Sequence, residues 1–227
     1  MARAKNLLKE AGVAGILPAR TAAVPGAESS RIHQTRAGKM PSPRAGGTPA
    51  TRSKDAAARI RLLVLDVDGV MTDGSVLLDA DGRELKRFDV TDGAGIKYFM
   101  RSGRQVAILS GRSSPAVTAR AVELGVTLIR QNAKDKLPAY RAILAAAGVS
   151  ESQTAVMGDD LPDLPLMRRC GLAIAPANAA AEVIEAADVV TARRGGGGAV
   201  REAVEHILRA AGAWETIVQR YRKEATQ

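Results

Sequence analysis

Three segments of the chain carry polar side chains of the kind that bind ions and transfer chemical groups. They are Asp66-Val-Asp68, Ser110-Gly-Arg112 and Gly158-Asp-Asp-Leu-Pro-Asp163, and each follows directly on a short apolar run. Asp66 and Asp68 stand two apart in an extended segment, so their side chains project to the same side within about 7 Å of each other. Ligands of open α/β sheets bind at the carboxyl ends of the strands. We therefore expect the carboxylates of the first and third segments to converge.

Several carboxylates gathered at one place require a cation. Without one they repel one another, and their pKa values rise. A hard divalent ion such as Mg²⁺ takes oxygen ligands and prefers one or two carboxylates together with waters and a substrate phosphate. The acidic segments therefore predict a Mg²⁺ site and a phosphate-bearing substrate.

The remaining residues limit the choice of nucleophile. The histidines are His33 and His206 and the single cysteine is Cys170, so neither a Ser-His-Asp nor a Cys-His arrangement is evident. A carboxylate is then left to do the covalent and acid–base work, and carboxylate nucleophiles form aspartyl-phosphates in phosphoryl transfer. Ser110 and Lys136 can supply a hydrogen bond and a positive charge to the phosphoryl oxygens.

The rest of the pattern indicates how these residues are positioned. Short apolar runs alternate with longer helical segments, which is typical of a parallel sheet covered by helices. Helix ends are marked by Ser114-Pro115 and by Gly125, among others. We expect an α/β, doubly wound, Rossmann-like sheet. Its strands are predicted at residues 62–65, 106–109, 126–129, 154–157, 172–175 and 188–190.

One segment, residues 75–88, breaks this alternation. It reads as two strands around Asp81-Gly82, which is a strong hairpin signal. A two-stranded hairpin is marginally stable alone, so its apolar side must pack on something. We predict a subunit interface there, with packing back on its own domain as the alternative. The apolar residues concerned are Val76, Leu77, Leu78, Leu85 and Phe88.

Charge and composition divide the chain in two. The formal net charge is +9, and most of it lies in residues 1–59, which are rich in Arg, Pro, Gly and Ala. Such a segment cannot bury enough apolar surface to offset chain entropy, so we expect a disordered basic arm at 1–59 and one domain at 60–227. The near-neutral domain is not expected to bind nucleic acid or membrane. The single cysteine excludes a disulfide scaffold and suits a reducing compartment, so we expect a cytoplasmic protein.

In order and position, these segments resemble the four motifs of the haloacid dehalogenase-like phosphatase superfamily. Within it, the chain is similar to the 3-deoxy-D-manno-octulosonate 8-phosphate phosphatases, a branch without an inserted cap domain. The spacing between the first acidic segment and Gly93 leaves room for the hairpin and not for a cap. The resemblance rests on Asp66-Val-Asp-Gly-Val-Met-Thr-Asp-Gly74, Glu84-Leu-Lys-Arg-Phe-Asp-Val-Thr-Asp-Gly93, Ser110-Gly-Arg112, Lys136, Gly158-Asp-Asp-Leu-Pro-Asp163 and Gly195-Gly-Gly-Gly-Ala-Val-Arg-Glu202.

The resemblance implies a role for each acidic residue. Asp66 would attack phosphorus, and Asp68 would protonate the leaving sugar oxygen and then activate water. Asp66, the backbone carbonyl of Asp68 and Asp159 would hold Mg²⁺, with Asp160 and Asp163 in the surrounding layer.

The resemblance also implies a substrate and an assembly. The predicted reaction is Mg²⁺-dependent hydrolysis of a sugar-acid phosphate, 3-deoxy-D-manno-octulosonate 8-phosphate, in lipopolysaccharide precursor synthesis. The expected assembly is a homotetramer in which the glycine-rich segment Gly195–Gly198 reaches an active site. Two positions depart from the family, because Gly197 and Thr91 stand where arginine is frequent. Substrate contacts are expected from Asp68, Asp89, Val90, Thr91, Asp92, Gly93, Lys97, Arg112, Arg120 and Lys136.

Three other functions remain open from the sequence. The same chemistry can act on a nonulosonate 9-phosphate of the sialic-acid type, although Arg112 favours the octulosonate. A non-catalytic oligomerisation domain of the same fold is a second alternative, although it has no need of mutually repelling carboxylates. Binding of a polyanion by the arm is the third.

Overall fold

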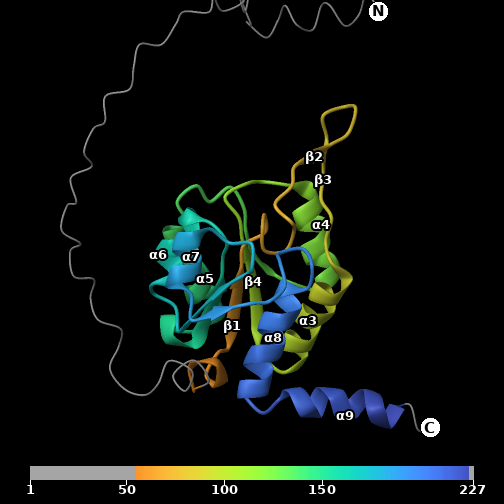
Figure 1. The fold of residues 1–227 in the computed structure, drawn as a ribbon, viewed down its shortest axis with the longest axis vertical. Helices are drawn as coiled ribbons and strands as arrows, with labels where there is room; N and C mark the ends of the chain where they lie inside the picture. The colour runs from red at the N-terminus through yellow and green to blue at the C-terminus, as the bar shows by residue number, and fades with distance from the viewer. Residues whose placement is uncertain (1–54, 225–227) are drawn as a thin grey trace, which may run out of the picture. The chain divides into compact units, whose positions relative to one another are not determined.

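The structure is a computed structural model that describes residues 55–224. Its centre is a six-stranded sheet in the order β5-β4-β1-β6-β7-β8, and every neighbouring pair is parallel (Figure 1). This confirms the predicted doubly wound α/β fold. The strands are β1 (Leu62–Leu65), β4 (Gln105–Leu109), β5 (Leu128–Arg130), β6 (Thr154–Met157), β7 (Leu172–Ala175) and β8 (Val189–Val190).

The start of β5 differs from the prediction. Val126 does not join the sheet, because its N–H donates to the carbonyl of Ala121 at 2.9 Å. Gly125 adopts a left-handed conformation, with φ at 79°, and ends the preceding helix. Val126 is buried beneath that helix end, so its apolar character reflects packing against the helix and not a strand.

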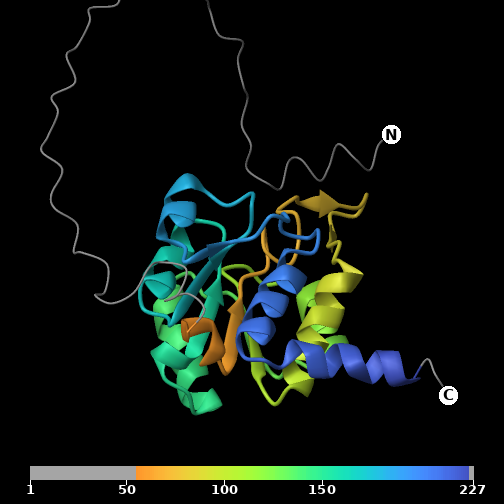
Figure 2. The ribbon, with the colours of Figure 1, turned by 60° about the horizontal axis from the view of Figure 1, so that its bottom comes forward.

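Helices cover both faces of the sheet, and the strand residues alternate between them. Leu63 and Leu65 of β1 belong to one core cluster, and Leu62 and Val64 belong to the other. Figures 1 and 2 show α3, α4 and α8 on one face and α5, α6 and α7 on the other. The helices are α3 (Val90–Arg101), α4 (Pro115–Leu124), α5 (Lys136–Ala147), α6 (Leu164–Met167), α7 (Ala181–Ala186), α8 (Ala199–Ala210) and α9 (Trp214–Glu224), with short 3-10 helices at Glu151–Gln153 and Leu161–Asp163.

The sheet order brings the predicted site segments together. β1 lies between β4 and β6, and Leu65 at the end of β1 is in register with Ile108 and Met157. The segments beginning at Asp66, Ser110 and Gly158 therefore leave the same edge of the sheet side by side.

The predicted hairpin is present as the antiparallel pair β2 (Leu77–Leu78) and β3 (Glu84–Leu85), with Leu77 opposite Leu85. It projects from the body of the domain (Figure 1). The leucines of the pair stay exposed, at 50% for Leu77, 63% for Leu78 and 55% for Leu85. Within the described chain these side chains do not pack back into the core.

Residues 1–54 of the predicted arm lie outside the described residues. The part of the predicted arm that the structure does describe belongs to the folded domain, because residues 55–58 are helical and Ala57 is buried in the core. None of the described helices is long and apolar enough to cross a membrane.

Candidate active site

Carboxylates from two strand ends converge where the sequence predicted a metal. Oxygens of Asp66, Asp159 and Asp163 lie within 4.8 Å of one another. Asp66 follows β1 and Asp159 follows β6, and the N–H of Asp66 donates to the carbonyl of Met157 at 3.1 Å. Oδ1 of Asp159 is buried and has no hydrogen-bond partner among the described residues. An orphaned oxygen in a ring of carboxylates fits a hard divalent cation.

Lys136 supplies the positive charge of this cluster. It is the first residue of α5, and its side chain is 5% exposed. Its Nζ lies 3.0 Å from Oδ1 of Asp66 and 2.7 Å from Oδ1 of Asp163. Burial alone would lower the pKa of Lys136, but the two carboxylates outweigh it and raise the pKa above its ordinary value. The lysine therefore stays charged beside Asp66.

The acidic groups are costly to ionise without a cation. Burial, and next the charge of Asp163, raise the pKa of Asp66 to about 6, although Lys136 opposes the rise. Burial raises the pKa of Asp159 to about 7, and the charges of Asp66 and Asp163 add to it. A divalent ion would remove this penalty, which is a second reason why these residues suit a metal.

Asp160 and Asp163 were predicted together, but the structure gives them different surroundings. Asp163 is buried, and its Oδ2 accepts from the N–H groups of Asp159 at 3.2 Å and Asp160 at 3.4 Å. It thus fixes both Lys136 and the turn that carries Asp159. Asp160 is exposed, and its Oδ1 accepts from the N–H of Leu161 at 2.8 Å, which caps the short helix that follows.

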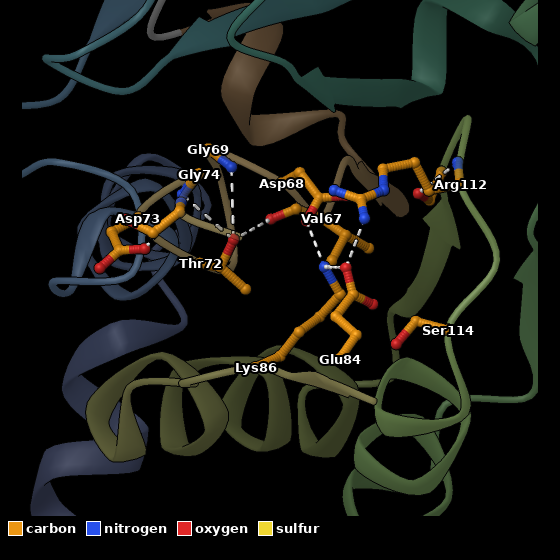
Figure 3. A network of polar contacts seen from close by, with 12 residues as sticks. Val67, Asp68, Gly69, Thr72, Asp73, Gly74, Glu84, Lys86, Arg112 and Ser114 are labelled. Carbon is orange, nitrogen blue, oxygen red and sulfur yellow. Dashed lines mark hydrogen bonds and ion pairs between the residues drawn. The ribbon is translucent and has the colours of Figure 1, made fainter. Parts of the chain in front are cut away.

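The turn after β1, which carries Asp68, is held by hydrogen bonds (Figure 3). Thr72 is at its centre, where Oγ1 donates to the carbonyl of Val67 at 3.3 Å and accepts from the N–H groups of Gly69 and Gly74. Gly69 has φ at 91°, and a Cβ there would lie 1.9 Å from Oδ2 of Asp159. We call residues 66–74 the catalytic loop.

Ser110 occupies the end of the adjacent strand β4. Its side chain is buried, and Oγ accepts from the N–H of Arg112 at 3.1 Å. Its carbonyl accepts from the N–H of Ala133 at 3.0 Å, in the loop that leads to Lys136. Ser110 therefore lies at the same sheet edge as Asp66, on a rigid turn.

The glycine-rich segment packs on the catalytic loop of its own chain. The N–H of Gly196 donates to the carbonyl of Val70 at 3.0 Å. Asn178 joins the two segments, because its Oδ1 accepts from the N–H of Gly195 at 2.7 Å and its Nδ2 donates to the carbonyl of Gly69 at 3.3 Å. Asn178 belongs to no motif that the sequence analysis recognised. Tertiary contact alone identifies it.

Two carboxylates of the predicted substrate segment Asp89–Gly93 act as helix caps. Asp89 begins α3, and its Oδ1 accepts from the N–H groups of Thr91 at 2.6 Å and Asp92 at 3.2 Å. Asp92 is buried, and it accepts from the N–H groups of Gly198 at 3.3 Å and Arg201 at 2.7 Å at the start of α8. Burial raises the pKa of Asp92 to about 6 against the effect of these bonds. Val90 and Thr91 are left exposed between the two caps.

The predicted basic residues are divided between the site mouth and the scaffold. Arg112 is partly exposed, and its Nη2 lies 2.5 Å from Oε1 of Glu84. Arg120 is mostly buried beside Gly93, and it donates to the carbonyl of Asp89 at 3.2 Å, so it braces the substrate segment. Lys97 is half-buried on α3.

Arg201, which follows the glycine-rich segment, does not face the cluster. Its guanidinium carbon lies 4.9 Å from the ring centre of Tyr98 and 5.1 Å from that of Trp214, and its Nε lies 2.7 Å from Glu205. These contacts join α3, α8 and α9. Trp214 is buried and packs between these elements.

Glu84 and Lys86 were not among the predicted site residues, yet Lys86 reaches the catalytic loop and Glu84 pairs with Lys86, with 3.3 Å between Oε1 and Nζ. The side chain of Lys86 forms an ion pair with Asp68 (Figure 3). The available signal was their spacing, because two charges two apart on a strand point to the same side.

Comparison with known proteins agrees with this geometry. A family model described as haloacid dehalogenase-like hydrolase matches residues 125–202. The 3-deoxy-D-manno-octulosonate 8-phosphate phosphatase KdsC of Yersinia pestis is 46% identical over 152 residues, which are 67% of this chain and 81% of that protein. KdsC of Escherichia coli is 43% identical over 156 residues, 69% of this chain and 83% of that protein.

Solved structures extend the likeness to three dimensions. The 3-deoxy-D-manno-octulosonate 8-phosphate phosphatase of Moraxella catarrhalis, in complex with magnesium ion, phosphate ion and KDO, gives a TM-score of 0.74 at 37% identity, covering 75% of this chain and 98% of that one. The Yersinia pestis enzyme gives 0.71 at 43% identity, covering 72% and 89%. With this identity over most of each relative's length, the chain belongs to the 3-deoxy-D-manno-octulosonate 8-phosphate phosphatase family of the haloacid dehalogenase-like hydrolases.

Proposed function

We propose that this enzyme hydrolyses 3-deoxy-D-manno-octulosonate 8-phosphate to the free sugar acid and phosphate, as a step in lipopolysaccharide precursor synthesis. The single observation that carries the chemistry is the contact of Lys136 Nζ with Asp66 at 3.0 Å, inside a cluster whose Asp159 oxygen has no other partner. A charged lysine against a buried carboxylate keeps that carboxylate ionised, which a nucleophile requires.

The proposed reaction uses two carboxylates of the catalytic loop. Asp66 attacks phosphorus while the bond from phosphorus to the sugar oxygen breaks, and Asp68 gives that oxygen a proton. Water then attacks the phosphorus of the aspartyl-phosphate and passes a proton to Asp68, which frees Asp66 and releases phosphate. Lys136 and Ser110 hold the phosphoryl oxygens through charge and hydrogen bonding.

The metal site of the proposal consists of Asp66, Asp159 and the backbone carbonyl of Asp68. Mg²⁺ bound there supplies positive charge to the phosphoryl oxygens. Asp163 keeps its place in the cluster as the partner of Lys136, at 2.7 Å.

Substrate choice is proposed to rest on two basic side chains. Arg112 is partly exposed and pairs with Glu84, and Lys97 is half-buried on α3. A guanidinium suits a carboxylate, which the sugar acid carries in addition to its phosphate.

The test is phosphate release from the octulosonate 8-phosphate and from a nonulosonate 9-phosphate, each with Mg²⁺ and with EDTA. We expect a higher kcat/KM for the octulosonate, loss of activity with EDTA, and loss of activity in Asp66→Ala with an unchanged circular dichroism spectrum. Preference for the nonulosonate would move the assignment to that substrate. Full activity of Asp66→Ala would refute the nucleophile.

We also propose that the hairpin builds a homotetramer. Its exposed leucines at positions 77, 78 and 85 form an apolar surface that the described chain leaves uncovered. Light scattering on Leu77→Ser combined with Leu85→Ser should show smaller particles than the parent protein. Val122→Ser on α4, which is 71% exposed, is the matched control and should leave the mass unchanged. Equal masses for all three proteins would contradict the proposal.

A further inference from the structure

Lys86 is a buried cation that joins the hairpin to the catalytic loop. It follows β3, and its side chain is 2% exposed. Its Nζ forms an ion pair with Oδ1 of Asp68 and lies 3.3 Å from Oε1 of Glu84. Figure 3 shows Lys86 and Glu84 extending toward Asp68, with Arg112 reaching Glu84 as well. The side chain of Asp68 is thus held from the hairpin, whereas Asp66 is held by Lys136.

The ion pair engages one oxygen of Asp68 and leaves the other available. Across residues 55–224, the Asp68 side chain forms its hydrogen bond and ion pair through Oδ1, and Lys86 is the partner in both. The second oxygen, Oδ2, has no such partner among these residues. A carboxyl group held by one oxygen has its plane restricted, while the second oxygen remains able to exchange a proton with a bound group. This is the arrangement that a general acid needs, because proton transfer requires hydrogen-bond distance and alignment.

Glu84 keeps Lys86 in place. Glu84 belongs to β3 and Lys86 follows that strand directly, and the two side chains meet with 3.3 Å between Oε1 and Nζ. Glu84 also accepts from Arg112 Nη2 at 2.5 Å, so its own position is fixed from α4's side of the site. A buried lysine costs free energy unless carboxylates pair with it, and this chain uses Asp68 as one of the two.

We propose that Lys86 is a positioning residue that orients the Asp68 carboxyl group toward the leaving oxygen of the substrate. The proposal rests on the proposed function, in which Asp68 is the acid. In that step a bond forms between Asp66 and phosphorus, the bond from phosphorus to the sugar oxygen breaks, and the proton moves from Asp68 to that oxygen. Lys86 exchanges neither a proton nor an electron pair. The effect proposed for it is on the orientation of the Asp68 carboxyl group.

The experiment compares two leaving groups in Lys86→Met. A sugar alkoxide needs a proton as it leaves, whereas the p-nitrophenolate of p-nitrophenyl phosphate leaves without one. The quantity to measure is kcat/KM, because it reports the steps up to loss of the leaving group and excludes hydrolysis of the aspartyl-phosphate. We expect kcat/KM to fall about 100-fold for the octulosonate 8-phosphate, the size expected when a catalytic group is misplaced, and less than about 3-fold for p-nitrophenyl phosphate.

Three further variants test whether the loss in Lys86→Met acts through Asp68. Arg83→Met, on the same hairpin with an exposed side chain 3.0 Å from Asp79, is the matched control and should change neither value. Asp68→Asn should show the same dependence on the leaving group, and Lys86→Met added to it should cause no further loss. Glu84→Gln keeps Lys86 but weakens its support, so it should give a smaller loss of the same kind.

The outcomes separate the two levels of the argument. Retained hydrolysis of p-nitrophenyl phosphate shows that Lys86→Met is folded. If Lys86→Met does not fold, the same two substrates are compared in Glu84→Gln. If kcat/KM falls equally on both substrates in Glu84→Gln, and in Lys86→Met where that variant folds, the positioning role is overturned. The ion pair of Lys86 with Asp68 would then serve the structure only. Equal losses on both substrates in Asp68→Asn would show instead that the acid of the proposed function is wrong.

Discussion

Gly195→Ala is the sharpest test of how the glycine-rich segment supports the active site. A Cβ at this position would lie 1.7 Å from the carbonyl oxygen of Gly69, 2.4 Å from its carbonyl carbon and 2.9 Å from the carbonyl oxygen of Thr72. These are backbone atoms that cannot rotate away, so the two segments must separate by roughly 1.5 Å to restore ordinary packing. The φ angle of Gly195 lies outside the left-handed region, so steric overlap is the whole of the effect.

The expected size follows from these contacts. Overpacking of a closely packed site costs about 1–3 kcal/mol, which corresponds to a fall in Tm of about 3–9 °C for a domain of this size. Displacing the catalytic loop by about 1 Å is expected to lower kcat about 100-fold, because the nucleophile leaves its reactive position.

The assay is phosphate release under saturating substrate and Mg²⁺, with calorimetry on the same samples. Gly197→Ala is the matched control, because its Cβ would have the carbonyl oxygen of Arg194 at 3.3 Å as its nearest neighbour. It should keep kcat within about 3-fold of the parent protein, since the catalytic loop is not displaced. Parental kcat and Tm in Gly195→Ala would refute the described packing of the segment on the loop.

Three other results are expected. In EDTA, Asp159→Asn should raise Tm, and this gain in Tm should grow from pH 5 to pH 8. The reason is that the pKa of Asp159 is raised from its ordinary 3.8 to about 7 in the folded protein. The folded parent protein therefore loses stability as the pH rises from about 4 to about 7. With saturating Mg²⁺ the order of the two Tm values should reverse, and a pH-independent gain would contradict the reasoning. Lys136→Met should lower the free energy of unfolding by about 3–5 kcal/mol in urea titrations without metal, because it leaves Asp66 and Asp163 buried without their cation, and a loss below about 1 kcal/mol would contradict this. Deletion of residues 1–54 should leave kcat/KM unchanged, and a large loss would show that the arm has a role in turnover.

Part of this structure was predictable because it depends on local pattern. β1, β6 and β7 occupy their predicted residues, since each is a short apolar run bounded by polar residues. The meeting of Asp66 with Asp159 follows from the rule that parallel strand ends share one edge of the sheet. The hairpin follows from its Asp-Gly turn.

The remainder depends on contacts between segments far apart in sequence. Asp160 and Asp163 look alike in the sequence, but one caps a helix at the surface and the other holds Lys136. Asp92 is predicted to meet substrate, and the sequence gives no sign that its carboxylate also accepts from the N–H groups of Gly198 and Arg201 at the start of α8. Asn178 carries no signal at all. Polar side chains of this kind acquire their partners only when the helices pack.

The support of the catalytic loop by Gly195 and Gly196 has a consequence for biosynthesis. β1 is the first strand of the sheet to leave the ribosome, whereas the segment that bonds to Val70 and Gly69 is made more than a hundred residues later. The nascent chain can therefore pair its early strands and still lack a finished phosphoryl-transfer centre until α8 has emerged. The packing of the catalytic loop thus waits for contacts of high sequence separation, which form slowly in folding.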